Sequence, residues 1–415
     1  METFIQWSQN NHVQAPHIAI RQTPHAGYGL FCDTAISKHG DNEAAAAAAL
    51  VTIPSTLILS ADRARHDRPD LVEITDDRTA LRLFLALEKH SPTVDFWKPY
   101  LGILDASMED FEQQVEGTCL EQAMQAKRSS LENQFAVLQP LFGEALTLEY
   151  WIWADRIVRS RAVGDTWMLV PFLDFANHSN EPNARWEVQP NGDMQIVPLS
   201  SSTLSAGDEV LFSYGAKSNM ELLFSYGFTL NDNPVESSVR ISAAGFLDDP
   251  AKIAWMRQLN IPPTLTLTNE HDNDDDESKK MGWSAQSIHL MYLIVMDPEE
   301  DALTLALDEQ DETTIHARVG DTQVENLNDL AQQARKLPQH PILLLRIVML
   351  LLDATQYHYD AITDAIARIK VSEMVDRYRS EEKLLLQRTL NKLTLLRDTL
   401  AQDKVVLDYL SAQQQ

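Results

Sequence analysis

The sequence has very few cysteines. Only Cys32 and Cys119 occur among 415 residues. Two thiols are too few for the disulfide framework of a secreted domain or for a cysteine-rich zinc site, so we expect no metal and a reducing intracellular compartment. The sequence also lacks a fixed-period repeat, which argues against a solenoid or a propeller.

Basic residues are scarce relative to acidic ones. There are 34 Lys and Arg residues against 61 Asp and Glu, which gives a formal net charge of −27 at pH 7. Phosphate backbones and anionic membranes repel such a chain, so we expect neither nucleic acid nor a membrane as partner. A protein substrate with a basic segment is electrostatically favoured, and we expect the chain itself to be a monomer.

The sequence also shows neither a signal peptide nor an apolar run long enough to span a membrane. The N-terminal METFIQWSQNNH lacks the basic start and apolar core of a signal peptide. The most apolar stretch, residues 341–354, is interrupted by Arg346 and is shorter than the roughly 20 residues that span a bilayer, so we predict a core helix. No basic targeting run occurs, and we expect a cytoplasmic or nuclear protein.

The hydrophobic pattern predicts a β-rich unit that a helical segment interrupts. Short β-branched and aromatic runs between turn formers predict strands in the first sixty residues and again from 167 to 214, with 167–176 as a buried strand. Between them, apolar residues spaced three and four apart predict amphipathic helices from 76 to 163. The run Ala44–Ala49 favours helix rather than strand, and we assign it no function.

Beyond residue 237 the pattern becomes mainly helical. An acidic segment at 269–280 interrupts it, which we interpret as an exposed loop. Leucines at helical spacing predict a helix over 380–400, capped by Ser380. The expected fold class is therefore α+β, a β-rich domain with a helical insert followed by an all-α domain. The expected segments are 1–75, 76–163, 164–236 and 237–415.

Three separated motifs lie within the predicted β-rich unit. They are HAGYGLF at 25–31, SRAV…VPFLDFANHSNEPN between 160 and 183, and AGDEVLFSYGAKSNMELLFSYGF at 206–228. GYG or NHS alone is a weak signal, because glycine turns and satisfied structural histidines are common. The third motif is far more specific, since two Tyr-Gly pairs flank a Ser-Asn turn.

In order and composition the three motifs resemble those of SET-domain methyltransferases, and more narrowly the branch similar to the Rubisco large-subunit lysine methyltransferase. In that branch a helical insert splits the SET domain and a helical substrate-binding domain follows. Many other SET enzymes have a cysteine-rich zinc cluster after the second Tyr-Gly pair, and this chain has no cysteine beyond Cys119. The resemblance implies S-adenosylmethionine as cofactor.

The first motif is similar to the turn that contacts the cofactor. The resemblance assigns this contact to the backbone of Ala26 and Tyr28. Gly27 and Gly29 suit such a turn because glycine permits positive φ and a close approach of the backbone.

The second motif is similar to the junction that holds the amino-acid part of the cofactor. The resemblance assigns this role to Asn177 and His178, largely through backbone groups, and places Asp174 and Arg161 at the same junction. Polar groups at the end of a buried segment would meet a zwitterionic ligand there. His178 is then a binding and structural residue and not a general base.

Tyr214 matches the tyrosine that is central to SET catalysis. Methyl transfer from a sulfonium to an amine is an in-line displacement, so the reacting atoms must be held about 3–3.5 Å apart and aligned. The amine must be neutral, and an apolar channel and the nearby sulfonium would both lower its pKa from about 10.4. A dedicated carboxylate base is then not required.

The resemblance also implies a channel for the substrate side chain. Aromatic residues in it would attract an alkylammonium group by cation–π contact, although ordinary core positions are the alternative for each of them. The implied channel residues are Ser160, Trp186, Ser225, Tyr226 and Phe228.

The leading interpretation is a protein-lysine N-methyltransferase acting on a non-histone protein. Protein-histidine N-methylation occurs in the same branch and is accompanied there by a tunnel asparagine. Ser225 and Phe228 flank the second tyrosine here without an asparagine, which favours lysine. A SET-like binding module without turnover is the third possibility, and the presence of Tyr214, Asn177 and His178 argues against it.

Overall fold

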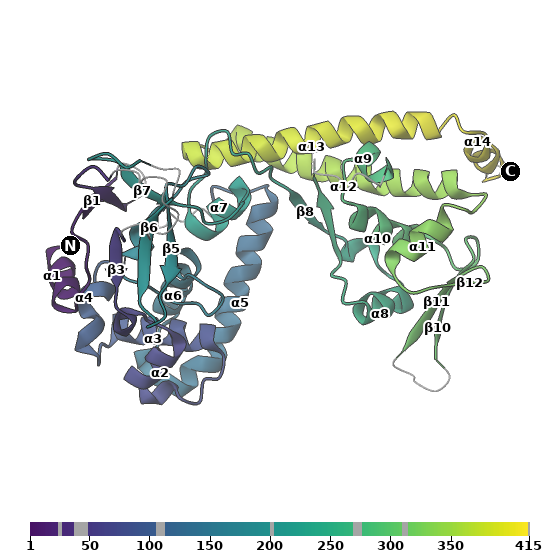
Figure 1. The fold of residues 1–415 in the computed structure, drawn as a ribbon. Coiled ribbons are helices and arrows are strands. Elements are labelled where there is room, and N and C mark those ends of the chain that lie inside the picture. Colours follow the sequence, from purple (N-terminus) through teal and green to yellow (C-terminus); the bar gives the residue numbers. More distant parts are fainter. Residues whose placement is uncertain are drawn as a thin grey trace. The chain divides into compact units, whose positions relative to one another are not determined.

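The computed structural model describes residues 1–23, 27–36, 49–104, 113–199, 203–268, 276–308 and 314–413. The predictions for Ala26, for most of the Ala44–Ala49 run and for acidic residues 269–275 lie outside this part. The chain folds into two compact units that alternate along the sequence (Figure 1). Unit 1 comprises Met1–Glu109, Gln125–Lys217 and Phe224–Gly227, and unit 2 comprises Asp110–Met124, Ser218–Leu223 and Phe228–Gln415.

Two small sheets form the β-rich part of unit 1. The first has the strand order β1-β2-β7-β4, in which the last pair is parallel and the others are antiparallel. The second is antiparallel with the order β3-β6-β5. The strands are β1 (Ile18–Gln22), β2 (Tyr28–Cys32), β3 (Val51–Ile53), β4 (Asn177–His178), β5 (Ala184–Val188), β6 (Met194–Pro198) and β7 (Glu209–Phe212).

Helices cover these sheets, as the spacing of apolar residues predicts. Asp76 caps α3 by accepting the Thr79 N–H at 2.7 Å, and Thr147 caps α6 in the same way through the Tyr150 N–H. Helices α3 and α6 pack against each other through buried apolar faces (Figure 1). The helices are α1 (Glu2–Asn10), α2 (Ala61–Asp67), α3 (Asp77–His90), α4 (Lys98–Leu101), α5 (Cys119–Phe142), α6 (Leu148–Arg161) and α7 (Asn219–Tyr226).

The prediction of a strand at 167–176 is wrong. Leu169 forms only an isolated bridge to Leu59, after which Phe172 adopts a positive φ of 73° and a 3-10 turn, η5, follows at Leu173–Phe175. Pro171 has no N–H to donate to a ladder, which disfavours a strand through this segment. The segment is nevertheless buried, so the apolar run correctly indicated burial but not conformation.

Unit 2 confirms the expected helical C-terminal region and adds strands that the sequence analysis missed. Two antiparallel sheets occur, β8-β9 and β10-β11-β12. The strands are β8 (Val239–Ser242), β9 (Thr264–Leu267), β10 (Leu303–Leu307), β11 (Ile315–Val319) and β12 (Thr322–Val324). The helices are α8 (Pro250–Gln258), α9 (Asp276–Met281), α10 (Ala285–Val295), α11 (Leu327–Ala334), α12 (His340–Arg368), α13 (Glu373–Leu400) and α14 (Lys404–Gln413).

The two long helices α12 and α13 of unit 2 pack against each other along their length (Figure 1). By length and composition alone, α12 is the one helix in the described part of the chain that could cross a bilayer. Leu343, Ile347 and Leu351 on α12 are nevertheless buried in the core of the unit, as expected of a core helix. The predicted cap at Ser380 is wrong, because α13 already begins at Glu373 and Ser380 lies inside it.

Candidate active site

Tyr214 lies two residues after β7, and its backbone N–H and its hydroxyl are each hydrogen-bonded, to His178 of β4 and to Ala176 between η5 and β4. Its backbone N–H donates to Nδ1 of His178 at 3.0 Å, and its hydroxyl donates to the carbonyl oxygen of Ala176 at 2.8 Å. The rings of Tyr214 and His178 stack with centroids 5.1 Å apart. Two hydrogen bonds and a stacked ring therefore fix the orientation of the phenol.

The charge states of both rings follow from this geometry. Nδ1 of His178 accepts a backbone N–H and so must keep its lone pair, which makes the imidazole neutral. Burial lowers the pKa of His178, in agreement with that state. Burial also raises the pKa of Tyr214, so the phenol remains protonated near neutral pH and acts as a donor.

Gly29 creates a close approach between β2, β4 and β7. A Cβ atom at this position would overlap Oε1 of Glu209 and lie 3.0 Å from Nδ2 of Asn177. Asn177 Nδ2 donates to Glu209 Oε1 at 2.7 Å, so an amide and a carboxylate meet directly over the glycine. Gly27, two residues earlier, has a positive φ of 72° that favours glycine.

Glu209 is a site residue that the sequence analysis missed. It lies inside the quoted third motif, two residues after a glycine turn and five before Tyr214. A carboxylate at the start of a predicted strand was the available signal, because an acid there must find a partner once the strand enters a sheet.

A second cluster surrounds Asp174 in η5. Its side chain is fully buried, and Oδ2 accepts the Tyr100 hydroxyl at 2.7 Å. Arg161 donates from Nη1 to the Asp174 carbonyl oxygen at 2.9 Å and lies 3.7 Å from Oδ2. Burial raises the pKa of Asp174 to about 6, against the lowering effects of Arg161 and Tyr100.

These contacts fix the backbone beside the Tyr214 phenol. Arg161 donates a hydrogen bond to the backbone carbonyl of Asp174, and Tyr214 donates one to the backbone carbonyl of Ala176. Tyr100 donates a third to the Asp174 carboxyl group. Carbonyl oxygens placed next to a protonated phenol provide acceptors for an incoming cationic or amine group. Tyr100 was not predicted, because it lies in the helical insert, far from every motif in the sequence.

The predicted channel residues are placed differently from one another. The Tyr226 ring centroid lies 4.7 Å from that of Tyr214, and Ser225 precedes Tyr226 on α7. Ser160 donates to the Arg156 carbonyl of its own helix at 2.8 Å. Trp186 lies on β5 opposite Ile196 and is 37% exposed. Phe228 belongs to unit 2.

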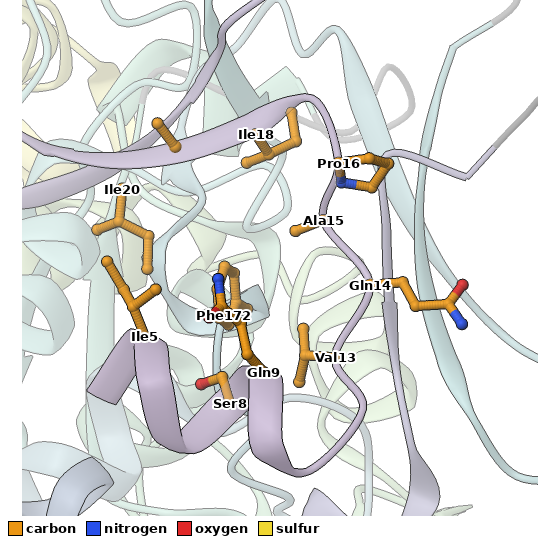
Figure 2. Close-up of a pocket in the computed structure, with 11 residues that line it drawn as sticks. Ile5, Ser8, Gln9, Val13, Gln14, Ala15, Pro16, Ile18, Ile20 and Phe172 are labelled. Carbon is orange, nitrogen blue, oxygen red and sulfur yellow. The ribbon is translucent and has the colours of Figure 1, made fainter. Parts of the chain in front are cut away.

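An apolar pocket of about 620 Å³ lies elsewhere in unit 1, between α1 and β1. Figure 2 shows Ile5 of α1 and Ile18 and Ile20 of β1 around Phe172. No ionisable side chain lines this pocket, so it offers no charged partner to a zwitterion. In the described part of the chain, no group of three His, Cys, Asp or Glu side chains is arranged to hold a metal ion.

The paired strands β4 and β7, together with Tyr214, lie within a stretch that matches a known family. Residues 27–215 match the model of the SET domain. This stretch of the chain is therefore similar to a SET domain. This match includes every described residue of the two clusters, Tyr226 excepted.

The comparisons with individual proteins extend beyond the SET domain itself. SET domain-containing protein 8 of Schizosaccharomyces pombe is 24% identical over 348 residues, covering 78% of this chain and 76% of that protein. Protein-lysine N-methyltransferase EFM1 of Saccharomyces cerevisiae is 24% identical over 308 residues, and the match spans 57% of this chain and about half, 51%, of EFM1.

A solved structure has a similar fold over most of the chain. The structure of Rubisco LSMT bound to AdoMet superimposes with a TM-score of 0.69 at 19% identity, covering 97% of this chain and 93% of that one. The predicted resemblance to this branch of SET proteins is therefore confirmed at the level of the fold, including the helical insert and the C-terminal region.

The Tyr100 hydroxyl provides a test of the Asp174 cluster. In the folded state the pKa of Asp174 is about 6, above the usual 3.8. Ionised Asp174 therefore lowers the stability of the fold increasingly as the pH rises from about 4 through about 6, and this cost is constant at higher pH. Removing the Tyr100 hydrogen bond should raise this pKa further. Asp174 would then become protonated at a higher pH than in the wild type. Because a protonated carboxyl group attracts Arg161 less, Arg161 would lose its fixed position at that higher pH.

We expect Tyr100→Phe to move the acid limb of the kcat profile to higher pH, with activity near pH 8 retained. The measurement is the methylation rate between pH 5 and 9. Tyr292→Phe is the matched control, because Tyr292 in unit 2 is also buried and bonded to a carboxylate, Glu277. An unchanged acid limb in Tyr100→Phe would contradict a role for the Asp174 charge in positioning.

Proposed function

We propose that this chain is an S-adenosylmethionine-dependent protein-lysine N-methyltransferase that acts on a non-histone protein. The observation that supports it best is the fixed, protonated Tyr214 phenol beside the Ala176 carbonyl in a SET domain. The name of EFM1 and the AdoMet in the LSMT structure point in the same direction.

The residues around Gly29 fit the proposed cofactor. The missing Cβ lets the Glu209 carboxylate and the Asn177 amide lie together over the buried backbone of Gly29. A carboxylate suits a ligand that bears an ammonium and a sulfonium group, and an amide suits its carboxylate. When bound, S-adenosylmethionine supplies a methyl group on a cationic sulfur. Gly29, Asn177, His178 and Glu209 would hold it.

The remaining residues position the amine and exclude water. The fixed Tyr214 hydroxyl and the carbonyls of Asp174 and Ala176 can orient the nitrogen for in-line attack. The ring of Tyr226 packs against Tyr214 and shields this position. A lysine side chain that enters such surroundings loses its proton more readily, because burial lowers the pKa of an ammonium group.

The charge of the whole chain supports a basic protein segment as substrate. With a net charge of −27, the chain attracts a lysine-rich surface at a distance. We propose that the C-terminal region binds this substrate, and that the protein acts as a monomer in the cytoplasm, the nucleus or both.

The proposal is tested by incubating the protein with isotopically labelled S-adenosylmethionine and extract of cells that lack it. We expect a labelled protein band, and mass spectrometry should locate the label on a lysine side chain. Label on an imidazole would assign the histidine activity instead. Cofactor binding without any label in extracts from several growth conditions would favour the binding module.

A further inference from the structure

A group of cationic side chains surrounds one buried carboxylate in unit 1, outside the candidate active site. The carboxylate is Asp155 of α6, whose side chain is fully buried. Its Oδ1 atom lies 2.8 Å from Lys127 Nζ and 3.0 Å from Arg82 Nη1. Arg78 Nη2 lies 3.8 Å from the same oxygen. One carboxylate oxygen is therefore shared by three cations from α3 and α5.

A fourth cation, Arg159, lies one turn further along α6. Its guanidinium stacks on the Phe224 ring, 4.6 Å from the centroid. Within the described ranges it has no hydrogen-bond acceptor and no ion-pair partner, and its Nε atom is buried. A cation–π contact uses only the face of the guanidinium, so it provides no acceptor for the N–H donors at the edge.

The cluster has more positive charge than its own carboxylates neutralise. Arg156 lies close enough to perturb Arg159, and Asp76 close enough to interact with Arg78 and Arg82. Arg78, Arg82 and Lys127 share the single carboxylate of Asp155, and Arg159 adds a fourth positive charge, in a chain whose net charge is −27. Burial and the neighbouring arginines lower the pKa of Arg159, so this position disfavours an uncompensated cation.

We propose that Arg78, Lys127 and Arg159 form a binding site for a small phosphate-bearing anion. The Nε atoms of both arginines are buried without an acceptor, and planar guanidinium groups match the oxygens of a phosphate. A dianion compensates the excess charge better than a single carboxylate does. The side chains of Arg78 and Lys127 remain 31% and 24% exposed, so the cluster is open to solvent.

A small solute is favoured over a polymer. The overall negative charge of the chain repels nucleic acid, whereas a single phosphate group meets only the local field of the cluster. The bound anion would join α3, α5 and α6, the three helices that supply the cations. It should therefore stabilise the fold by linkage to binding.

The test is calorimetric titration of the full-length protein with inorganic phosphate and with O-phosphoserine, at an ionic strength kept constant with sodium chloride. We expect saturable binding to one site, weakened about tenfold or more in Arg159→Gln. Arg159→Lys keeps the charge but loses the planar guanidinium group. Its affinity for phosphate should therefore lie between those of the wild type and Arg159→Gln. Tighter binding of phosphoserine would indicate a protein-borne phosphate, and tighter binding of inorganic phosphate a free ion.

Arg128→Gln is the matched control. Arg128 follows Lys127 on α5, its side chain is 50% exposed, and it pairs with Glu132. This variant removes the same net charge and should bind phosphate like the wild type. The proposal is overturned if phosphate does not bind saturably below about 10 mM, or if Arg159→Gln, with unchanged circular dichroism, binds as tightly as Arg128→Gln.

Discussion

Tyr214→Phe is expected to lower kcat for methyl transfer about 10²- to 10³-fold and to leave binding of S-adenosylhomocysteine nearly unchanged. The substitution removes one oxygen, which now donates to the Ala176 carbonyl and marks the position where the amine must be oriented. The backbone N–H of Tyr214 still donates to His178, and the aromatic ring can still stack on it. The scaffold should therefore persist while the orientation of the nucleophile is lost.

Steady-state rates with a whole-protein substrate and calorimetric binding of S-adenosylhomocysteine separate these effects. Tyr150→Phe is a suitable control, because Tyr150 is a half-buried tyrosine of the same unit whose ring contacts His90. Its rate should stay within about twofold of the wild type, because the substitution keeps the ring and removes only a hydroxyl group away from Tyr214. Full activity of Tyr214→Phe would show that the phenol does not position the amine. Loss of S-adenosylhomocysteine binding would make Tyr214 part of the scaffold instead.

Gly29→Ala is expected to weaken binding of S-adenosylhomocysteine about 10- to 100-fold, the equivalent of about 1–3 kcal/mol of overpacking. The new methyl group would overlap Glu209 Oε1 and crowd Asn177 Nδ2. The carboxylate and the amide would have to separate, and the cradle that both form over the glycine would change shape. The loss should appear mainly in the dissociation constant.

Gly245→Ala is the control for this variant. Gly245 lies in unit 2, and a Cβ atom there would meet nothing within 4 Å. The melting temperature of each variant without ligand reports on folding, and its rise with S-adenosylhomocysteine reports on binding. If Gly29→Ala retained the wild-type rise, the space beside Gly29 would not belong to the cofactor.

The local pattern of the sequence predicted most elements of unit 1 but not the contacts between them. Short β-branched and aromatic runs identified β5 and β6, and three- and four-residue spacing identified α3 and α6. The contact of Tyr214 with His178 needs the parallel pairing of β4 with β7, which no local pattern encodes. The family resemblance named Tyr214 and His178 but not their contact, and it did not name Tyr100, because a buried hydroxyl in a helical insert has no signature of its own.

The wrong and missed predictions have identifiable causes. Burial of residues 167–176 was correct, but Pro171 and the positive φ of Phe172 make the segment turn. The strand β11 was missed although its signal was present: Ile315, Ala317 and Val319 are buried and alternate with exposed residues. This alternation is only five residues long, and it lies in a C-terminal region that we interpreted as mainly helical.

The strand order β1-β2-β7-β4 has a consequence for how the protein is made. The strand β7 is the last of the four to leave the ribosome, yet it lies between β2 and β4. Until it is synthesised, β2 has a free edge and β4 has no partner in the sheet, so both expose unpaired backbone groups to other chains. The Glu209–Asn177 pair over Gly29 and the Tyr214 contacts therefore form only after β7 has emerged, and a chain that stalls before Glu209 should be prone to aggregate.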